Sequence, residues 1–219
     1  MATKVFVSAG TPADDSQKSF RDAVVNAVEL AGFTPRLMGA KDWDYKNPLR
    51  GVRRAMDECR GAVVVAYPRY KIDAGTELRH DGGRSLEAVT FPTAWNQIEA
   101  AMAYEKGLPL LVVAESKLRR EAMFDSGNDI RPFWTDLDSA IGRSDGFLGY
   151  LRSWKEDVEQ CAQAQTDSTR APLRDITTVQ VLGALPWYEL LAVIATFVGA
   201  LVAASSIGYR IGSGQWPLG

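Results

Sequence analysis

The feature that most constrains the fold of this chain is a set of short apolar runs that recur along its first half. Residues 61–66 read Gly-Ala-Val-Val-Val-Ala, residues 108–114 are entirely apolar, and Lys4–Ser8 holds three apolar residues in a row. Runs this short and unbroken are typical of strands that are buried on both faces of a parallel sheet. We therefore expect a covered sheet at the centre of the fold.

Helical spacing fills most of the intervals between these runs. Apolar side chains recur three or four positions apart in residues 16–31, 47–60, 93–106 and 149–165. With a further strand over residues 33–38, strands and helices alternate along the chain. This alternation predicts an α/β fold with a doubly wound parallel sheet of about five strands. Ligands in that architecture bind beyond the carboxyl ends of the strands.

The interval over residues 68–91 differs from the others because it is charged, rich in Gly and without helical spacing. A loop of this length inside a compact domain is usually a lid or disordered, and we expect one of these here. The interval contains His80, the only histidine of the chain. Neither His80 nor the two cysteines, Cys59 and Cys161, stand in a metal-ligand spacing, so no metal site and no disulfide framework are predicted.

Residues 190–209 form a second apolar feature, which contains no charged residue. Twenty helical residues at about 1.5 Å each cover the roughly 30 Å core of a bilayer. Trp187 and Tyr188 on one side, and Tyr209 and Trp216 on the other, stand where interfacial aromatic residues belong. The alternative is a helix buried in a protein core, but no second apolar domain exists to surround it. We predict a single transmembrane helix.

The chain is therefore expected to have four parts: an α/β domain (1–161), a linker and juxtamembrane segment (162–186), a transmembrane helix (187–210) and a short tail (211–219). Arg170 and Arg174 precede the span and only Arg210 follows it, which favours a cytoplasmic N-terminal domain. The first residues lack the apolar core of a secretory signal. The 25 Lys and Arg nearly balance the 27 Asp and Glu, and no long basic stripe is present, so nucleic-acid binding is not expected.

Chemistry is concentrated in the predicted helix over residues 93–106. Trp95 and Glu99 are four positions apart and share a face, one turn after the long interval ends. A carboxylate at this edge of the sheet can face a bound nucleotide. The alternatives are that Glu99 is an ordinary exposed helix residue and that Trp95 belongs to the core.

Three segments give the chain a resemblance to known families. Lys4–Ser8 resembles the first strand of TIR-like domains, and Trp95-Asn-Gln-Ile-Glu99 resembles their Trp-x-x-x-Glu helix. The spacing of Glu99, Ala103, Gly107 and Pro109 resembles that of nucleoside 2-deoxyribosyltransferase-like domains. The resemblance covers roughly residues 4–160 and implies a flavodoxin-like, TIR-like domain. In both families the Glu acts at the anomeric carbon of a nucleoside or of NAD, so Glu99 is the implied catalytic residue.

Five further residues are candidates for substrate binding because they follow predicted strands at the carboxyl edge. Ser8, Ala9 and Gly10 end the first strand, where backbone N–H groups can meet a phosphate or ribose hydroxyl. Arg69 and Tyr70 follow the third strand, and Arg69 can pair with a diphosphate. The alternatives are that Ser8, Ala9 and Gly10 only form a turn and that Arg69 is an ordinary solvent-exposed arginine. The full Gly-Thr-x-x-Glu-x-Gly pattern of deoxyribosyltransferases is missing, although Gly75-Thr-Glu77 stands displaced in the long interval.

Two functions remain open from the sequence. The first is a membrane-anchored N-glycosidase that acts on NAD or a related nucleotide as substrate and needs no cofactor. The resemblance implies a role in bacterial defence or signalling, and the predicted span places the protein at the cell inner membrane. The second is a non-catalytic TIR-like module that binds a nucleotide or protein and couples assembly to the membrane. Ala195, Gly199 and Ala203 form a small-residue row in the span, from which a homo-oligomer is expected.

Overall fold

A computed structural model provides the structure of the chain and divides it into two compact units, Met1–Asp167 and Ser168–Gly219. The residues that the structure describes are 2–39, 42, 46–80, 82–125, 129–170 and 195–196. Within these ranges no helix is both long enough and apolar enough to cross a membrane. The predicted transmembrane helix over residues 187–210 and the predicted tail lie almost entirely outside the described residues.

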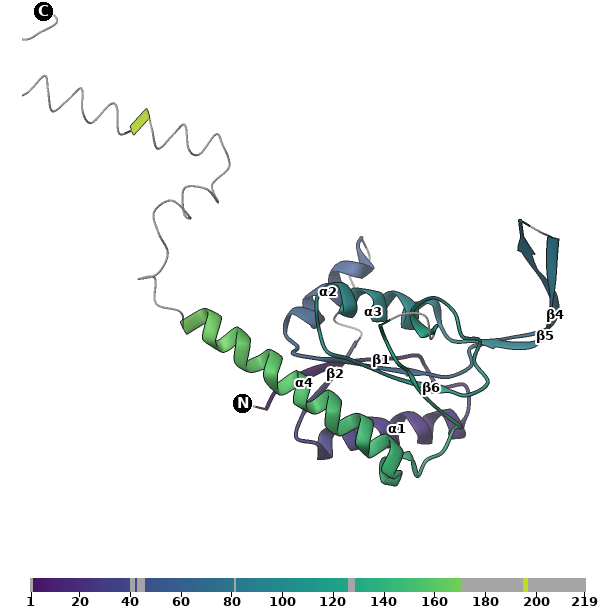
Figure 1. Cartoon of the computed structure of the whole chain (residues 1–219), viewed down its shortest axis with the longest axis horizontal. Helices are drawn as coiled ribbons and strands as arrows, with labels where there is room; N and C mark the ends of the chain where they lie inside the picture. The colour runs from purple at the N-terminus through teal and green to yellow at the C-terminus, as the bar shows by residue number, and fades with distance from the viewer. Residues whose placement is uncertain are drawn as a thin grey trace, which may run out of the picture. The chain divides into compact units, whose positions relative to one another are not determined.

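The first unit is built on a parallel sheet of five strands (Figure 1). The strands are β1 (Lys4–Ala9), β2 (Thr34–Leu37), β3 (Ala62–Ala66), β6 (Leu110–Glu115) and β7 (Phe133–Thr135). Their order is β2-β1-β3-β6-β7, and every neighbouring pair is parallel. With the hairpin β4–β5 set aside, this is the 2-1-3-4-5 order of flavodoxin-like sheets. The predicted α/β fold with a parallel sheet of about five strands is confirmed.

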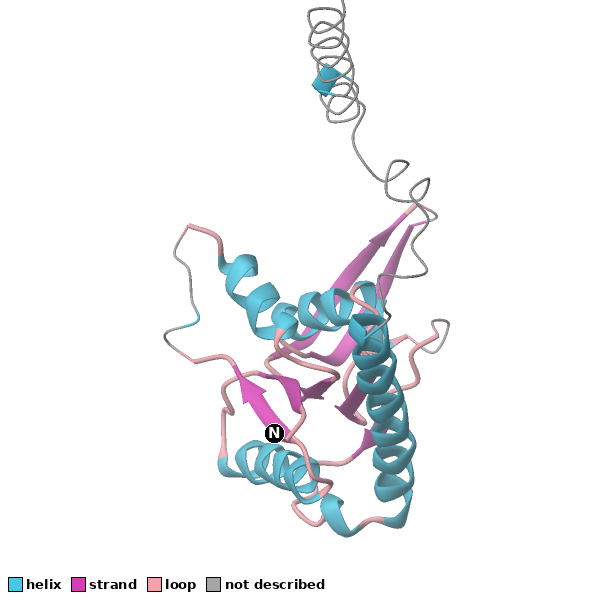
Figure 2. Cartoon of the chain, turned by 90° about the vertical axis from the view of Figure 1, so that its left-hand side faces the viewer, coloured by secondary structure: helices cyan, strands magenta, loops and turns pink. Residues whose placement is uncertain are grey.

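Helices cover both faces of the sheet. Helices α2 (Pro48–Asp57) and α3 (Ala94–Glu105) lie on one face, and α1 (Asp15–Leu30) and α4 (Asp145–Arg170) lie on the other (Figures 1 and 2). Side chains cap three of these helices, because Asp14, Asn47 and Thr93 each accept a hydrogen bond from a backbone N–H of the first turn. Helix α1 begins at Asp15, one residue before the range 16–31 in which helical spacing predicted it.

The central strand β3 explains why its sequence is apolar at every position. Val63 and Val65 point to the face covered by α1 and α4, and Val64 and Ala66 point to the opposite face. All five residues of the strand are buried. Since both faces of a doubly wound sheet are covered by helices, neither set of alternate side chains meets water.

The interval predicted as a lid or disordered loop is instead an antiparallel hairpin of β4 (Tyr70–Arg79) and β5 (Gly82–Phe91). It projects from the carboxyl edge of the sheet (Figures 1 and 2). Most of its side chains are exposed on both faces, and Leu78 is 90% exposed. Alternation of apolar and polar residues predicts a strand that is buried on one face. A hairpin that is exposed to solvent on both faces lacks this alternation, so its strands were not predicted.

Three segments near the end of the first unit differ from the sequence-based boundaries. Residues 116–121, which follow the predicted strand over residues 108–114, form a turn and an extended stretch that lead into a 3₁₀ turn over Ala122–Phe124. Residues 133–135, left without a clear assignment, form the edge strand β7. Helix α4 continues to Arg170, so residues 162–170 of the predicted linker are helical. The linker was predicted there because the sequence of that stretch lacks apolar residues at helical spacing.

Candidate functional site

A cavity of about 550 Å³ opens at the carboxyl edge of the sheet, between the ends of β1 and β2, the segment that follows β3, and the start of α3. Strand β1 has β2 on one side and β3 on the other, so the chain changes direction across the sheet at this point. In doubly wound folds such a switch point is where ligands bind. All seven residues singled out from the sequence line this cavity: Ser8, Ala9, Gly10, Arg69, Tyr70, Trp95 and Glu99.

Glu99 is a buried carboxyl group in the wall of the cavity, with a side chain that is only 6% exposed. Burial raises the pKa of Glu99 to about 7, and a hydrogen bond with Ser8 opposes this rise. The alternative that Glu99 is an ordinary exposed helix residue is therefore wrong. A buried carboxyl that changes charge near neutral pH, inside a cavity, has the properties of a functional group.

Asn96 holds Ser8 in position beneath Glu99, and the sequence did not single it out. The Asn96 side-chain amide donates a hydrogen bond to Ser8 Oγ at 3.1 Å, and Asn96 Oδ1 accepts one from Thr93 Oγ1 at 2.7 Å. Because Ser8 Oγ already accepts from Asn96, its single hydrogen remains for the Glu99 carboxylate. Asn96 lies three residues before Glu99 on α3, a helical spacing that was visible in the sequence.

The loop after β1 passes close to the start of α3. A Cβ atom on Gly10 would lie 2.9 Å from Thr93 Cγ2, so only glycine allows this approach without a shift. The Tyr67 hydroxyl, at the end of β3, donates a hydrogen bond to the Gly10 carbonyl. Burial raises the pKa of Tyr67 to about 12, which keeps this donor protonated at neutral pH. Tyr67 follows the third predicted strand but was not among the candidate site residues, since its contact is with a residue 57 positions away.

The outer rim of the cavity is supplied by the first residues of the hairpin. The Arg69 backbone N–H donates to the Phe91 carbonyl at 2.8 Å, so pairing with the end of β5 fixes the base of this rim. Among the described residues, the exposed Arg69 guanidinium has no carboxylate within 4 Å. Tyr70 is 61% exposed beside it. Trp95 is half-buried and packs against the α2 side of the core while it also lines the cavity.

Two other ionisable residues have different surroundings. His80 is exposed near the turn of the hairpin and does not line the cavity. Glu115 is buried at the end of β6, where its carboxylate accepts a hydrogen bond from the Lys117 backbone N–H at 2.9 Å. Burial raises the pKa of Glu115, but its contacts close a turn. Within the described ranges, no three His, Cys, Asp or Glu side chains are grouped so that they could hold a metal ion.

Replacement of Asn96 by Ala should destabilise the domain, because Asn96 is 2% exposed and the change leaves buried hydrogen-bonding groups without partners. We expect the free energy of unfolding to fall by about 1–3 kcal/mol. Chemical denaturation followed by tryptophan fluorescence measures the change. Ile98→Ala on the exposed side of the same helix is the control and should change stability by less than about 0.5 kcal/mol. Equal effects of the two substitutions would show that the Asn96 network adds nothing.

Comparisons with known proteins leave the family of this chain open. No protein-family model matches the chain, and no curated protein matches it either. A solved structure that it resembles is the metal-soaked Flv1 flavodiiron core from Synechocystis sp. PCC6803, with a TM-score of 0.36 and 12% sequence identity. That match covers 76% of this chain and 37% of the flavodiiron core. The fold assignment therefore rests on the strand order of the sheet itself.

Proposed function

We propose that the chain is an N-glycosidase of the TIR-like or nucleoside deoxyribosyltransferase-like kind, which cleaves the glycosidic bond of NAD or a related nucleotide. The observation that supports this most is the buried Glu99 carboxyl group in the wall of a cavity at the switch point of the sheet. The cavity also gathers the other six residues that the sequence singled out. Its volume of about 550 Å³ is within the range of small-molecule sites.

The proposed chemistry needs one ionised carboxylate. When the bond between C1′ and the base nitrogen breaks, the electron pair leaves with the base and positive charge develops at C1′. The Glu99 carboxylate stabilises this oxocarbenium-like centre or bonds to it, as carboxylates do in glycoside hydrolysis. Water then adds to C1′ and releases its proton to the solvent. A positively charged pyridinium is a good leaving group because it departs neutral, so NAD requires no second acid.

The surrounding residues have matching roles. Ser8 donates a hydrogen bond to Glu99 and so favours its ionised form against the effect of burial. Arg69, at the rim, is placed to pair with a phosphate of the substrate. Trp95 and Tyr70 offer aromatic surfaces for a base or ribose.

The cellular setting is proposed from the sequence. The charge-free segment over residues 190–209 would anchor the chain in the inner membrane, with the α/β domain in the cytoplasm. Its small-residue row would bring copies of the chain together as a homo-oligomer. Assembly of this kind raises the local concentration of the attached domains, which suits a role in defence or signalling.

The function is tested by incubating the full chain, purified in detergent, with NAD and separately with nucleosides, and by measuring the free base by chromatography. We expect release of nicotinamide from NAD, at a rate that rises with pH through about 7 because the ionised form of Glu99 is required. The control is Glu115→Gln, which alters a buried carboxyl group outside the cavity and should leave the rate unchanged. No base release from any substrate, with nucleotide binding retained, would favour the non-catalytic module.

A further inference from the structure

A second cavity, of about 630 Å³, lies between the hairpin and the segment that follows β6. We call it the arginine pocket. Its lining includes the cations Arg79, Arg84, Lys117, Arg119 and Arg120. The acids that line it are Glu87, Glu121 and Asp125. None of its residues lines the cavity that holds Glu99, so the two sites are separate.

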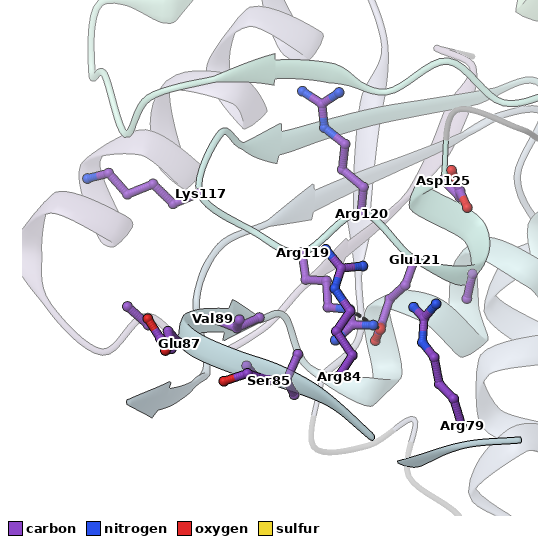
Figure 3. Close-up of a pocket in the computed structure, with 13 residues that line it drawn as sticks. Arg79, Arg84, Ser85, Glu87, Val89, Lys117, Arg119, Arg120, Glu121 and Asp125 are labelled. Atoms are coloured by element: carbon purple, nitrogen blue, oxygen red, sulfur yellow. Dashed lines mark ion pairs between the residues drawn. The ribbon is translucent and has the colours of Figure 1, made fainter. Parts of the chain in front are cut away.

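Two acidic residues at the arginine pocket, Glu77 and Glu121, form ion pairs with its arginines. Glu77 pairs with Arg119 at 2.8 Å and with Arg79 at 3.1 Å, and Glu121 pairs with Arg119 at 3.1 Å. Among the described residues, Arg84 is exposed and has no carboxylate within 4 Å. In Figure 3 the guanidinium groups of Arg79, Arg84 and Arg119 lie toward the same side, whereas Lys117 and Arg120 point away from them. The pocket thus presents two arginines held by ion pairs, Arg79 and Arg119, and beside them the exposed guanidinium group of Arg84.

Hydrogen bonds fix the two walls of the pocket to each other and to the domain. The Arg119 backbone N–H donates to the Thr90 carbonyl at 2.9 Å, and Thr90 Oγ1 donates to the Lys117 carbonyl at 2.8 Å. On the other side, the Gln97 side chain of α3 accepts from the Met123 backbone N–H at 3.0 Å. A hairpin on its own is only marginally stable in water, so these contacts keep the pocket open in a defined shape.

Backbone strain is concentrated in the same pocket. Among the described residues, the two non-glycine residues with positive φ are Ala88 at 51° and Ala122 at 48°, and both line the arginine pocket. The register pairs Ile72 with Val89 and Ala74 with Glu87, so that Ala88 interrupts the ladder. Figure 1 shows the hairpin bending between its base and its tip. Strained backbone of this kind persists where the structure requires it and is common at binding sites.

We propose that the arginine pocket binds a small molecule that carries at least two phosphate groups. Planar guanidinium groups match phosphate oxygens with paired N–H donors, and several of them on one wall fit a chain of phosphates better than a single anion. The polar, cationic lining is unlike the mostly apolar lining of sites for uncharged ligands. The phosphates can belong to a nucleotide or to an inorganic polyphosphate, and both present the same groups to these arginines.

The test is isothermal titration of the full chain in detergent with inorganic triphosphate, which has no base or ribose for the Glu99 cavity. We expect saturable binding of one triphosphate per chain. Arg84→Glu should weaken it by at least about tenfold, because it replaces a guanidinium group that lies outside the ion pairs of Glu77 and Glu121 by a carboxylate that repels the phosphates. Arg84→Ala, which adds no negative charge opposite Glu77, should weaken it in the same direction. The control is Arg53→Glu, which makes the same charge change at an exposed residue outside the pocket and should weaken triphosphate binding less than threefold. A larger effect at Arg84 than at Arg53 would show that local contacts, and not net charge alone, determine the affinity.

Further variants separate this site from the Glu99 cavity and from the proposed glycosidase activity. Arg69→Ala, which removes the cation of the Glu99 cavity, should leave triphosphate binding unchanged. ATP should bind within tenfold of triphosphate if the phosphates carry recognition, and much more tightly if the pocket is specific for a nucleotide. The proposal is overturned if triphosphate does not bind, if Arg84→Glu and Arg84→Ala bind as well as the unmodified chain, or if only Arg69→Ala loses binding. None of these outcomes depends on catalysis.

Discussion

Replacement of Glu99 by Gln is expected to abolish cleavage while it makes the domain more stable at alkaline pH. Gln keeps the shape of the side chain and an oxygen that accepts from Ser8, but it carries no charge to stabilise a positive centre. We expect the rate of base release to fall by about a thousandfold, which is typical for loss of a positioned catalytic group. Comparison of kcat for the two chains under saturating substrate measures this loss.

The gain in stability follows from the raised pKa of Glu99. Burial raises this pKa from 4.5 to about 7, so the folded state binds the proton more tightly than the unfolded state. The carboxyl group therefore favours folding fully below about pH 4.5, and this contribution is lost as pH rises through about 7. Gln has no proton to lose, and its advantage over Glu should grow by about 3 kcal/mol between pH 4.5 and pH 8.

Thermal unfolding at both pH values checks this second result. For a domain of this size the expected difference in Tm at pH 8 is roughly 6–12 °C. Glu115→Gln is the matched control for stability and activity, because Glu115 is buried with a raised pKa but lies outside the cavity. It should show a gain of the same sign without loss of cleavage. If Glu99→Gln retained most of the cleavage, Glu99 would not be the catalytic group.

Replacement of Trp154 by Ala is expected to cause the largest loss of stability from a single change. Trp154 on α4 is 5% exposed, meets the Phe33 ring edge-on at 5.2 Å, and donates from Nε1 to the Pro109 carbonyl at 2.9 Å. Its ring also packs over Gly61, where an added Cβ would lie 3.1 Å from Trp154 Cζ2. We expect the free energy of unfolding to fall by about 3–5 kcal/mol, the usual cost of removing a buried aromatic ring.

Two variants on α4 make the result specific. Trp154→Phe keeps most of the buried ring but loses the hydrogen bond. The lost hydrogen bond should lower the free energy of unfolding by about 1 kcal/mol, in addition to the loss caused by the smaller side chain. Glu156→Ala on the exposed side of the same helix should stay within about 0.5 kcal/mol of the unmodified chain. Urea denaturation measures all three. A small effect of Trp154→Ala would mean that α4 is not an integral part of the domain.

Much of the fold could be predicted from local sequence patterns. Apolar runs with no polar interruption identified β1, β3 and β6, because a strand covered on both faces excludes polar side chains whatever surrounds it. Helical spacing identified α1, α2, α3 and α4 for a similar reason, since one stripe of each helix must face the sheet. Placement of Glu99 near the carboxyl edge followed from the alternation of strands and helices.

What only the tertiary structure decided is how residues far apart in the chain meet. The burial of Glu99, which raises its pKa, and the Ser8 hydrogen bond, which opposes that rise, both depend on the packing of α3 beside β1. The contacts of Asn96 with Ser8 and of Tyr67 with Gly10 join positions 88 and 57 residues apart. The hairpin was not predicted because most of its side chains are exposed on both faces. In the structure its arginines lie beside the segment that follows β6. Local sequence patterns show which side chains must be buried, and they therefore predict strands and helices. The two cavities are formed by residues that are far apart in the sequence and share no local pattern, so only the tertiary structure shows that they meet.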